Sequence, residues 1–132
     1  MTLLLDAGIW AAATNRDEPF YRESDALVES PGPLAALDLT LFEVANTVGV
    51  KWGKRERAGL VLDTILARCR KRLVRVDLEI TLEAIAIAQE HGLTAYDAAY
   101  VAAARRHGWT LVSTDIADLV SKGLAVAPDA AV

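Results

Sequence analysis

The chain has 132 residues, 53% of them hydrophobic, and a formal net charge of −4 at neutral pH. This length suits one domain with a single core, so we expect one domain over residues 1–132. A single cysteine, Cys69, excludes an intrachain disulfide framework and fits a reducing cytoplasm. We do not expect the apolar run from Leu3 to Ala13 to be a signal peptide, because Asp6 interrupts it and no basic residue precedes it.

The first half of the chain alternates short apolar runs with helical patterns. In order, we predict a buried strand at 3–5, helices at 9–13 and 19–29, a strand at 34–39 and a helix at 40–52. Asp6 ends the first strand, and Gly8 allows a tight turn after it. Thr40 and Glu43 match a capping box, which gives Glu43 a structural role as a cap partner. Asn46 lies three residues further on the same predicted face, where its amide can orient Glu43.

The second half begins with an unevenly charged stretch. Between residues 51 and 75 lie nine of the 14 basic residues: Lys51, Lys54, Arg55, Arg57, Arg68, Arg70, Lys71, Arg72 and Arg75. A local basic surface suits an enzyme that acts on a polyphosphate chain. Solvated faces of a helix pair explain the same charges, and on charge alone this simpler explanation is favoured.

From there the elements follow in quick succession. We predict helices at 55–72, 79–91, 95–107 and 115–122, strands at 73–76 and 109–112, an edge strand at 124–127 and a frayed tail at 128–132. Thr94 suits the N-cap of the helix at 95–107, and Gly108 suits the residue that ends it. Strands that alternate with helices predict an α/β fold with a mainly parallel central sheet and helices on both faces.

Four acids fall at one predicted edge of this sheet. Asp6, Glu43 and Asp115 lie near the carboxyl ends of strands, and Asp97 opens the most apolar helix. Each alone is explained by helix capping. Together their carboxylates would repel one another unless a divalent cation offset the charge, and oxygen ligands without a Cys/His cluster indicate Mg²⁺ or Mn²⁺. Such a centre can activate water and orient a phosphodiester.

Other chemistries find less support in the sequence. There is no glycine-rich phosphate loop of the GxxxxGK[ST] or GxGxxG type. His91 and His107 end helices, where capping explains them, and Cys69 has no evident partner base. A phosphorylation-receiver domain would need an acid pair after the first strand, where this chain has Asp6 alone.

Four segments, in order along essentially the whole chain, resemble the PIN-domain family and, within it, the VapC toxins: LLLDAGIWAA, LTLFEVANTV, LTAYDAAYVAAARRHG and LVSTD. The resemblance implies a three-layer α/β/α fold and an acidic catalytic quartet of Asp6, Glu43, Asp97 and Asp115. Of these, Asp6, Asp97 and Asp115 would hold Mg²⁺ or Mn²⁺, and Glu43 would position or deprotonate the water. Thr114 would support the centre and Asp118 would be an additional acid.

The resemblance also implies an activity and partners. It implies a metal-dependent endoribonuclease that forms a homodimer and is blocked by a VapB-like antitoxin. The RNA-contacting residues would come from the basic stretch, namely Lys51, Lys54, Arg55, Arg68 and Arg72. Two alternatives stay open: an RNA-processing PIN nuclease without a toxin role, and a catalytically silent PIN fold that binds RNA or a protein partner.

The chain departs from the family pattern directly after the first aspartate. Relatives commonly carry Ser or Thr and then Asn or Ser there, whereas this chain has Ala7 and Gly8. The loss of a side-chain hydrogen-bond partner at this place would weaken support for the metal ligands without removing a ligand.

Overall fold

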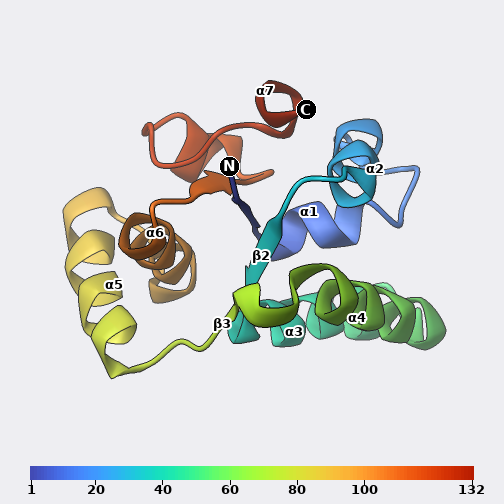
Figure 1. Cartoon of the computed structure of the whole chain (residues 1–132), viewed down its shortest axis with the longest axis horizontal. Helices are drawn as coiled ribbons and strands as arrows, with labels where there is room; N and C mark the ends of the chain where they lie inside the picture. The colour runs from blue at the N-terminus through green and yellow to red at the C-terminus, as the bar shows by residue number, and fades with distance from the viewer.

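The computed structural model describes residues 1–132 and has a parallel four-stranded sheet at its centre (Figure 1). The strands are β1 (Leu3–Leu5), β2 (Leu34–Leu37), β3 (Leu73–Val74) and β4 (Thr110–Val112), in the spatial order β3-β2-β1-β4. Leu4 of the central strand β1 is in register with Ala35 of β2 and Leu111 of β4. Because all pairs are parallel, the carboxyl ends of the strands lie at one edge, as the sequence predicts.

Helices cover both faces of the sheet, which confirms the predicted three-layer α/β arrangement (Figure 1). One face carries α1 (Ala7–Ala12), α2 (Tyr21–Glu29), α3 (Asp38–Val44), the π-helical segment η1 (Ala45–Lys51) and α4 (Arg55–Cys69). The other face carries α5 (Leu78–His91), α6 (Ala95–His107) and the π-helical segment η3 (Ile116–Val120). A 3₁₀ turn, η2 (Arg70–Arg72), precedes β3, and a short helix, α7 (Pro128–Ala131), ends the chain.

Successive side chains of each strand point to opposite faces of the sheet and pack into two separate hydrophobic cores. In β1, Leu4 packs with the α5 and α6 side chains, whereas Leu5 packs with Ile9, Trp10 and the α4 side chains on the opposite face. Both leucines are fully buried. The apolar runs of the sequence are therefore strands covered on both faces, as expected for a parallel sheet.

Helix α6 contains the longest unbroken run of buried residues of any helix in the fold. Its N-cap is Thr94, whose hydroxyl accepts a hydrogen bond from the Asp97 amide at 3.2 Å, and Gly108 ends it in the left-handed conformation with φ of 67°. Every residue from Ala98 to Ala104 is buried. Most of these side chains are methyl groups, so the helix axis can approach the sheet and α5 closely. Both predicted caps are confirmed.

Some predicted boundaries are wrong. The strand predicted at 34–39 ends at Leu37, because α3 already begins at Asp38. Thr40 is therefore inside the helix rather than at its cap, and its hydroxyl accepts the Leu37 amide at 3.0 Å. The helix predicted at 40–52 changes from α to π geometry after Val44.

The predictions for the end of the chain are also corrected. The edge strand predicted at 124–127 is reduced to one parallel bridge between Val126 and Val112. The tail predicted to fray contains α7, whose Pro128 is buried and which packs against α2. None of the helices combines the length and apolar character that a membrane span requires.

Arg68 and Arg72 of the basic stretch stabilise the backbone next to β2. The Arg68 guanidinium donates to the carbonyls of Val28, Ser30 and Gly32, and the Arg72 Nε donates to the Leu34 carbonyl at 2.8 Å. These bonds join the end of α4 to the α2–β2 connection. The two arginines therefore have a structural role that the charge pattern did not reveal.

Candidate metal centre

The predicted acids converge at the carboxyl edge of the sheet. Asp6 follows β1 and Asp115 follows the adjacent strand β4, while Asp97 stands in the first turn of α6 and Glu43 near the end of α3. Their charges act on one another: Glu43 and Asp97 raise the pKa of Asp6, and Asp115 and Asp118 raise the pKa of Asp97. Four chain segments thus bring five carboxyl groups within electrostatic reach of each other.

Asp6 is the most tightly held of these acids. Its Oδ1 accepts the Ile9 amide at 3.2 Å, so Asp6 also caps α1, and its Oδ2 accepts the Ser113 hydroxyl. The pKa of Asp6 is raised from 3.8 to about 7: burial has the largest effect, the hydrogen bonds to Ser113 and Ile9 lower the pKa, and the charges of Glu43 and Asp97 raise it. The fold therefore holds an acid whose ionisation at neutral pH is only partly compensated.

Ser113 connects the two strand ends that carry aspartates. Its hydroxyl donates to Asp6 Oδ2 and accepts the Asp115 amide at 2.9 Å. Sequence reasoning assigned the supporting role to Thr114, but no side-chain hydrogen bond of Thr114 joins the acids in this structure. The spacing of a serine two residues before the aspartate was the available signal, since alternate residues of an extended chain face the same side.

Glu43 is oriented by a buried tyrosine. The Tyr100 hydroxyl donates to Glu43 Oε1 at 2.6 Å and lies 2.8 Å from the Thr40 hydroxyl, which itself accepts the Leu37 amide. Each hydroxyl has one proton, so Thr40 donates to Tyr100 and Tyr100 donates to Glu43. In place of the expected capping box, a polar chain of hydrogen bonds runs from the Leu37 amide through the Thr40 and Tyr100 hydroxyls to the Glu43 carboxylate. Burial raises the pKa of Glu43, the Tyr100 bond lowers it, and the Asp97 charge raises it.

Of the other two predicted supporting residues, one lies beside the acids and the other does not contact Glu43. Asp118 lies next to the centre, because its amide donates to Asp115 Oδ1 at 2.9 Å and its charge acts on Asp97. Asn46 lies exposed on η1 and makes no hydrogen bond to Glu43. The π geometry explains this, since its wider turn no longer places residues three apart on one face. Tyr100, three residues after Asp97 on α6, takes the expected place of Asn46.

No protein cation balances these acids. The charges that perturb Asp6, Glu43 and Asp97 are all carboxylates, and the salt bridges of the fold lie at Arg106 and His91. Of the predicted RNA-contacting residues, Lys51, Lys54 and Arg55 are exposed at the junction of η1 and α4, whereas Arg68 and Arg72 hold backbone carbonyls. The negative charge of the centre is therefore not neutralised from within.

The residues fit a hard divalent cation in donor chemistry. They supply carboxylate and hydroxyl oxygens, which Mg²⁺ and Mn²⁺ prefer, and a net negative charge that a cation would offset. As the side chains stand, no three of them already surround a common point at ligand distance.

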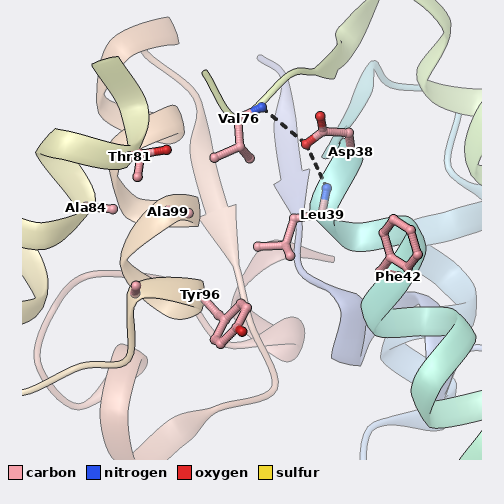
Figure 2. A pocket seen from close by; sticks show the side chains of 9 residues that line it. Asp38, Leu39, Phe42, Val76, Thr81, Ala84, Tyr96 and Ala99 are labelled. Carbon is pink, nitrogen blue, oxygen red and sulfur yellow. Dashed lines mark hydrogen bonds between the residues drawn. The ribbon is translucent and has the colours of Figure 1, made fainter. Parts of the chain in front are cut away.

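An apolar pocket of about 370 Å³ lies between α3 and the α5–α6 pair (Figure 2). It is lined by Asp38, Leu39, Phe42, Val76, Thr81, Ala84, Ala95, Tyr96 and Ala99. Phe42 directly precedes Glu43, and Tyr96 directly precedes Asp97. The two aromatic residues are 80% and 62% exposed, respectively. Asp38 is a structural acid here, because its Oδ1 accepts the amides of Leu39 at 2.8 Å and Val76 at 3.1 Å.

Burial also explains the inertness expected of Cys69. Its thiol lies in the core under α4, and burial raises its pKa to about 11 in spite of Arg72 and Arg68 nearby. The thiol therefore stays protonated at neutral pH and is no nucleophile.

Comparison with known proteins identifies relatives over most of the chain. Residues 3–118 match the model of the PIN domain family. Ribonuclease VapC3 of Pyrobaculum aerophilum is 33% identical over 123 residues, which cover 87% of this chain and 90% of that protein. Among solved structures, a toxin–antitoxin complex from Klebsiella pneumoniae superposes with a TM-score of 0.71 at 24% identity, covering 96% of this chain and 97% of that one. VapC20 of Mycobacterium tuberculosis, described as a sarcin-ricin loop cleaving toxin, superposes with a TM-score of 0.71 at 16% identity. The superposition covers 84% of this chain and 86% of that one.

The raised pKa of Asp6 predicts a pH-dependent loss of stability in metal-free protein. The folded state holds the Asp6 proton more tightly than the unfolded chain, so the contribution of Asp6 to stability is largest below about pH 4 and is lost as the pH rises through about 7. Asp6→Asn removes this cost and should stabilise the protein at pH 8 by up to about 4 kcal/mol, but not at pH 4. Urea unfolding in chelator at both pH values measures the difference. The exposed Asp63→Asn serves as control, and a pH dependence equal to that of the wild type in Asp6→Asn would contradict the account.

The polar chain predicts a specific effect of Tyr100→Phe. The variant loses the bond that favours ionised Glu43, so the pKa of Glu43 should rise further above its ordinary value. Loss of a buried hydrogen bond to a charged group should also lower stability by about 1.5–3 kcal/mol. Carbon-detected NMR titration of the glutamate carboxyls measures the first effect. Tyr96→Phe, on the same helix but exposed, should leave the Glu43 titration unchanged; an unchanged titration in Tyr100→Phe would exclude the role of the bond.

Proposed function

Because the chain belongs to the PIN domain family, we propose that it is a Mg²⁺- or Mn²⁺-dependent endoribonuclease and the toxin of a VapBC-type toxin–antitoxin pair. The observation that carries the proposal is the group of uncompensated carboxylates, held at the sheet edge by Ser113 and Tyr100. A relative of nearly the same length is named a ribonuclease. We also propose that the protein acts in the cytoplasm.

Each acid has a distinct part in the proposed hydrolysis. Asp6, Asp97 and Asp115 would hold the cation, which offsets phosphate charge and lowers the pKa of bound water when present. Glu43 would orient the attacking water and accept its proton, since burial raises the pKa of Glu43 towards neutrality, where a general base is most effective. Ser113 would hold Asp6 and Asp115 at a fixed distance from each other while the RNA is cleaved, because it bonds to the Asp6 carboxylate and to the Asp115 amide.

The proposed RNA contacts come from the exposed part of the basic stretch. Lys51, Lys54 and Arg55 are free to meet phosphates along the strand that enters the centre. Phe42 and Tyr96 expose aromatic rings beside Glu43 and Asp97, on which unpaired bases can stack. Arg68 and Arg72 are left out of this surface, because their guanidinium groups are bonded to backbone carbonyls.

A VapB-like antitoxin is the proposed protein partner. Complexes of this kind are found among structures with the same fold. The acids themselves support an inhibitor that inserts a basic side chain, because such a group would offset their charge and exclude the cation.

A homodimer is the proposed oligomeric state. Leu78, Leu82 and Ile85 repeat every three to four residues along α5, and all three are exposed. We expect Leu82→Glu to shift the protein from dimer to monomer in sedimentation equilibrium. Leu60→Glu, at an exposed leucine of α4, should leave the dimer intact. A monomeric wild type would exclude the homodimer.

Two other functions of the same fold differ in what they predict. An RNA-processing nuclease without a toxin role would share the chemistry but would lack a small antitoxin gene directly upstream. A silent binding module would bind RNA or a partner and cut nothing. The hydrogen bonds that fix Asp6 and Glu43 favour a working centre over the silent module.

Cleavage of cellular RNA tests the proposal directly. Purified antitoxin-free protein should cut RNA with Mg²⁺ or Mn²⁺ and stop in chelator. Asp97→Asn should lower the rate more than about 100-fold, because it removes a charged ligand. The amide that Thr94 caps belongs to the backbone, so the helix end is preserved in this variant.

The matched control is Asp63→Asn, at an exposed acid of α4, which should cut like the wild type. Equal cutting by Asp97→Asn would reveal a contaminating nuclease. A folded wild type that cuts no RNA with either metal would favour the silent module.

A further inference from the structure

The pocket between α3 and the α5–α6 pair combines an apolar lining with one charged group. Seven of its nine lining residues are hydrophobic, and its volume of about 370 Å³ suits a small planar ligand. The charged group is Asp38, whose Oδ1 accepts the Leu39 and Val76 amides (dashed lines in Figure 2). Its Oδ2 has no hydrogen-bond partner, and Asp38 takes part in none of the salt bridges of the fold. One carboxylate oxygen is therefore free to bind a ligand.

The polar side chains of this pocket offer acceptors to a ligand. The oxygens of an ionised carboxylate can only accept, so Asp38 Oδ2 needs a donor. The Thr81 hydroxyl donates its proton to the Asp77 carbonyl at 2.7 Å and is also left as an acceptor. Only the Tyr96 hydroxyl can take either role. A ligand that matches the pocket is therefore largely apolar and carries an N–H donor.

Two exposed aromatic side chains from different helices line the pocket. Phe42 belongs to α3 and Tyr96 to α6, and both rings are largely surrounded by solvent (Figure 2). Such rings are available to stack on a planar ligand. Each directly precedes one of the acids in the sequence, Glu43 and Asp97, so the pocket shares two helices with the candidate metal centre.

An unpaired cation stands beside the pocket in the chain. Arg75 directly precedes the lining residue Val76, is exposed and takes part in no salt bridge. A basic side chain of a protein partner would be attracted by Asp38 but repelled by Arg75. A nucleotide unites a planar ring, an amino donor and an anionic phosphate, and so suits the aromatic rings, Asp38 and Arg75 together.

We propose that this pocket binds one unpaired base of the RNA and selects bases with an exocyclic amino group over uracil. The amino group donates to Asp38 Oδ2, the base stacks on Phe42 or Tyr96, and Arg75 contacts a flanking phosphate. Uracil has only its N3–H as a base-edge donor, between two carbonyl oxygens that the Asp38 carboxylate repels. Asp38 is thus a specificity-determining residue. The inference rests on the proposed function for its RNA substrate but does not require cleavage.

RNA binding in chelator tests the site without cleavage. The two probes are a short oligouridine and the same strand with one central cytosine, since cytosine has the size of uracil and carries an amino group in place of a carbonyl. In fluorescence anisotropy at low ionic strength, the wild type should bind the cytosine strand about tenfold more tightly, because only that strand donates to Asp38.

Asp38→Asn provides the sharpest variant. The side-chain amide keeps an oxygen for the Leu39 and Val76 amides and places an NH₂ donor where Oδ2 stands. The preference should therefore reverse, so that the oligouridine binds more tightly. Asp63→Asn, at an exposed acid of α4, removes the same charge and should keep the preference of the wild type for cytosine. Any general gain in RNA affinity from the lost charge cancels in this comparison.

The aromatic rings and the arginine should affect both strands alike. Phe42→Leu and Tyr96→Leu together should weaken binding of each strand by about tenfold or more, because a base can stack on either ring. Arg75→Gln should weaken both and lower the salt dependence by about one phosphate contact. Circular dichroism verifies that each variant is folded, and the comparison of the two strands in the wild type depends on no variant.

Three results would overturn the proposal. The first is equal or absent binding of the two strands by the wild type, and the second is an unchanged cytosine preference in folded Asp38→Asn. The third is a Phe42→Leu, Tyr96→Leu protein that becomes monomeric in sedimentation but binds RNA normally, since the pocket would then be a contact between copies of the chain. If the wild type shows the predicted preference but cuts no RNA with Mn²⁺, the base site stands and the ribonuclease proposal fails.

Discussion

The repulsion among carboxylates at the carboxyl edge of the sheet is the constraint on which the rest of the structure depends. Burial alone makes ionised Asp6 costly at neutral pH, and Glu43 and Asp97 add to that cost. The pairing of β1 with β4 fixes the position of Asp6 at this edge. Hydrogen bonds from the Ser113 hydroxyl and the Ile9 amide hold its carboxylate in one orientation and partly offset the cost. Selection for stability alone would not bring these acids together, because their repulsion destabilises the fold. We therefore infer that they bind a cation.

Local signals made much of the fold predictable. The apolar runs that form β1, β2 and β4, the Thr94 cap and the Gly108 stop are readable within a few residues, because strand burial and helix capping are local properties. The place of Asp6 and Asp115 also followed from the sequence, since parallel strands end at the same edge of a sheet. Resemblance to a family then supplied roles that no spacing could give.

The partners of the acids were not predictable, because they come from distant parts of the chain. Tyr100 meets Glu43 across 57 residues, and Ser113 meets Asp6 across 107. The predicted capping box does not form, because α3 begins at Asp38 and Thr40 therefore lies inside the helix. Charge counting failed in a similar way for Arg68, whose guanidinium satisfies backbone carbonyls rather than a ligand. Composition shows how many charges a segment has and not what they bind.

The most direct test of the cation centre is the free energy of unfolding as a function of Mn²⁺ concentration at neutral pH. A cation that binds only the folded protein should raise this free energy with the logarithm of its concentration above the dissociation constant, by about 2.7 kcal/mol at a hundredfold excess over that constant. Asp115→Asn should flatten the dependence while leaving the fold intact. A wild-type free energy that does not change with Mn²⁺ would contradict the account, because the acids would then gather at the sheet edge without a cation to serve.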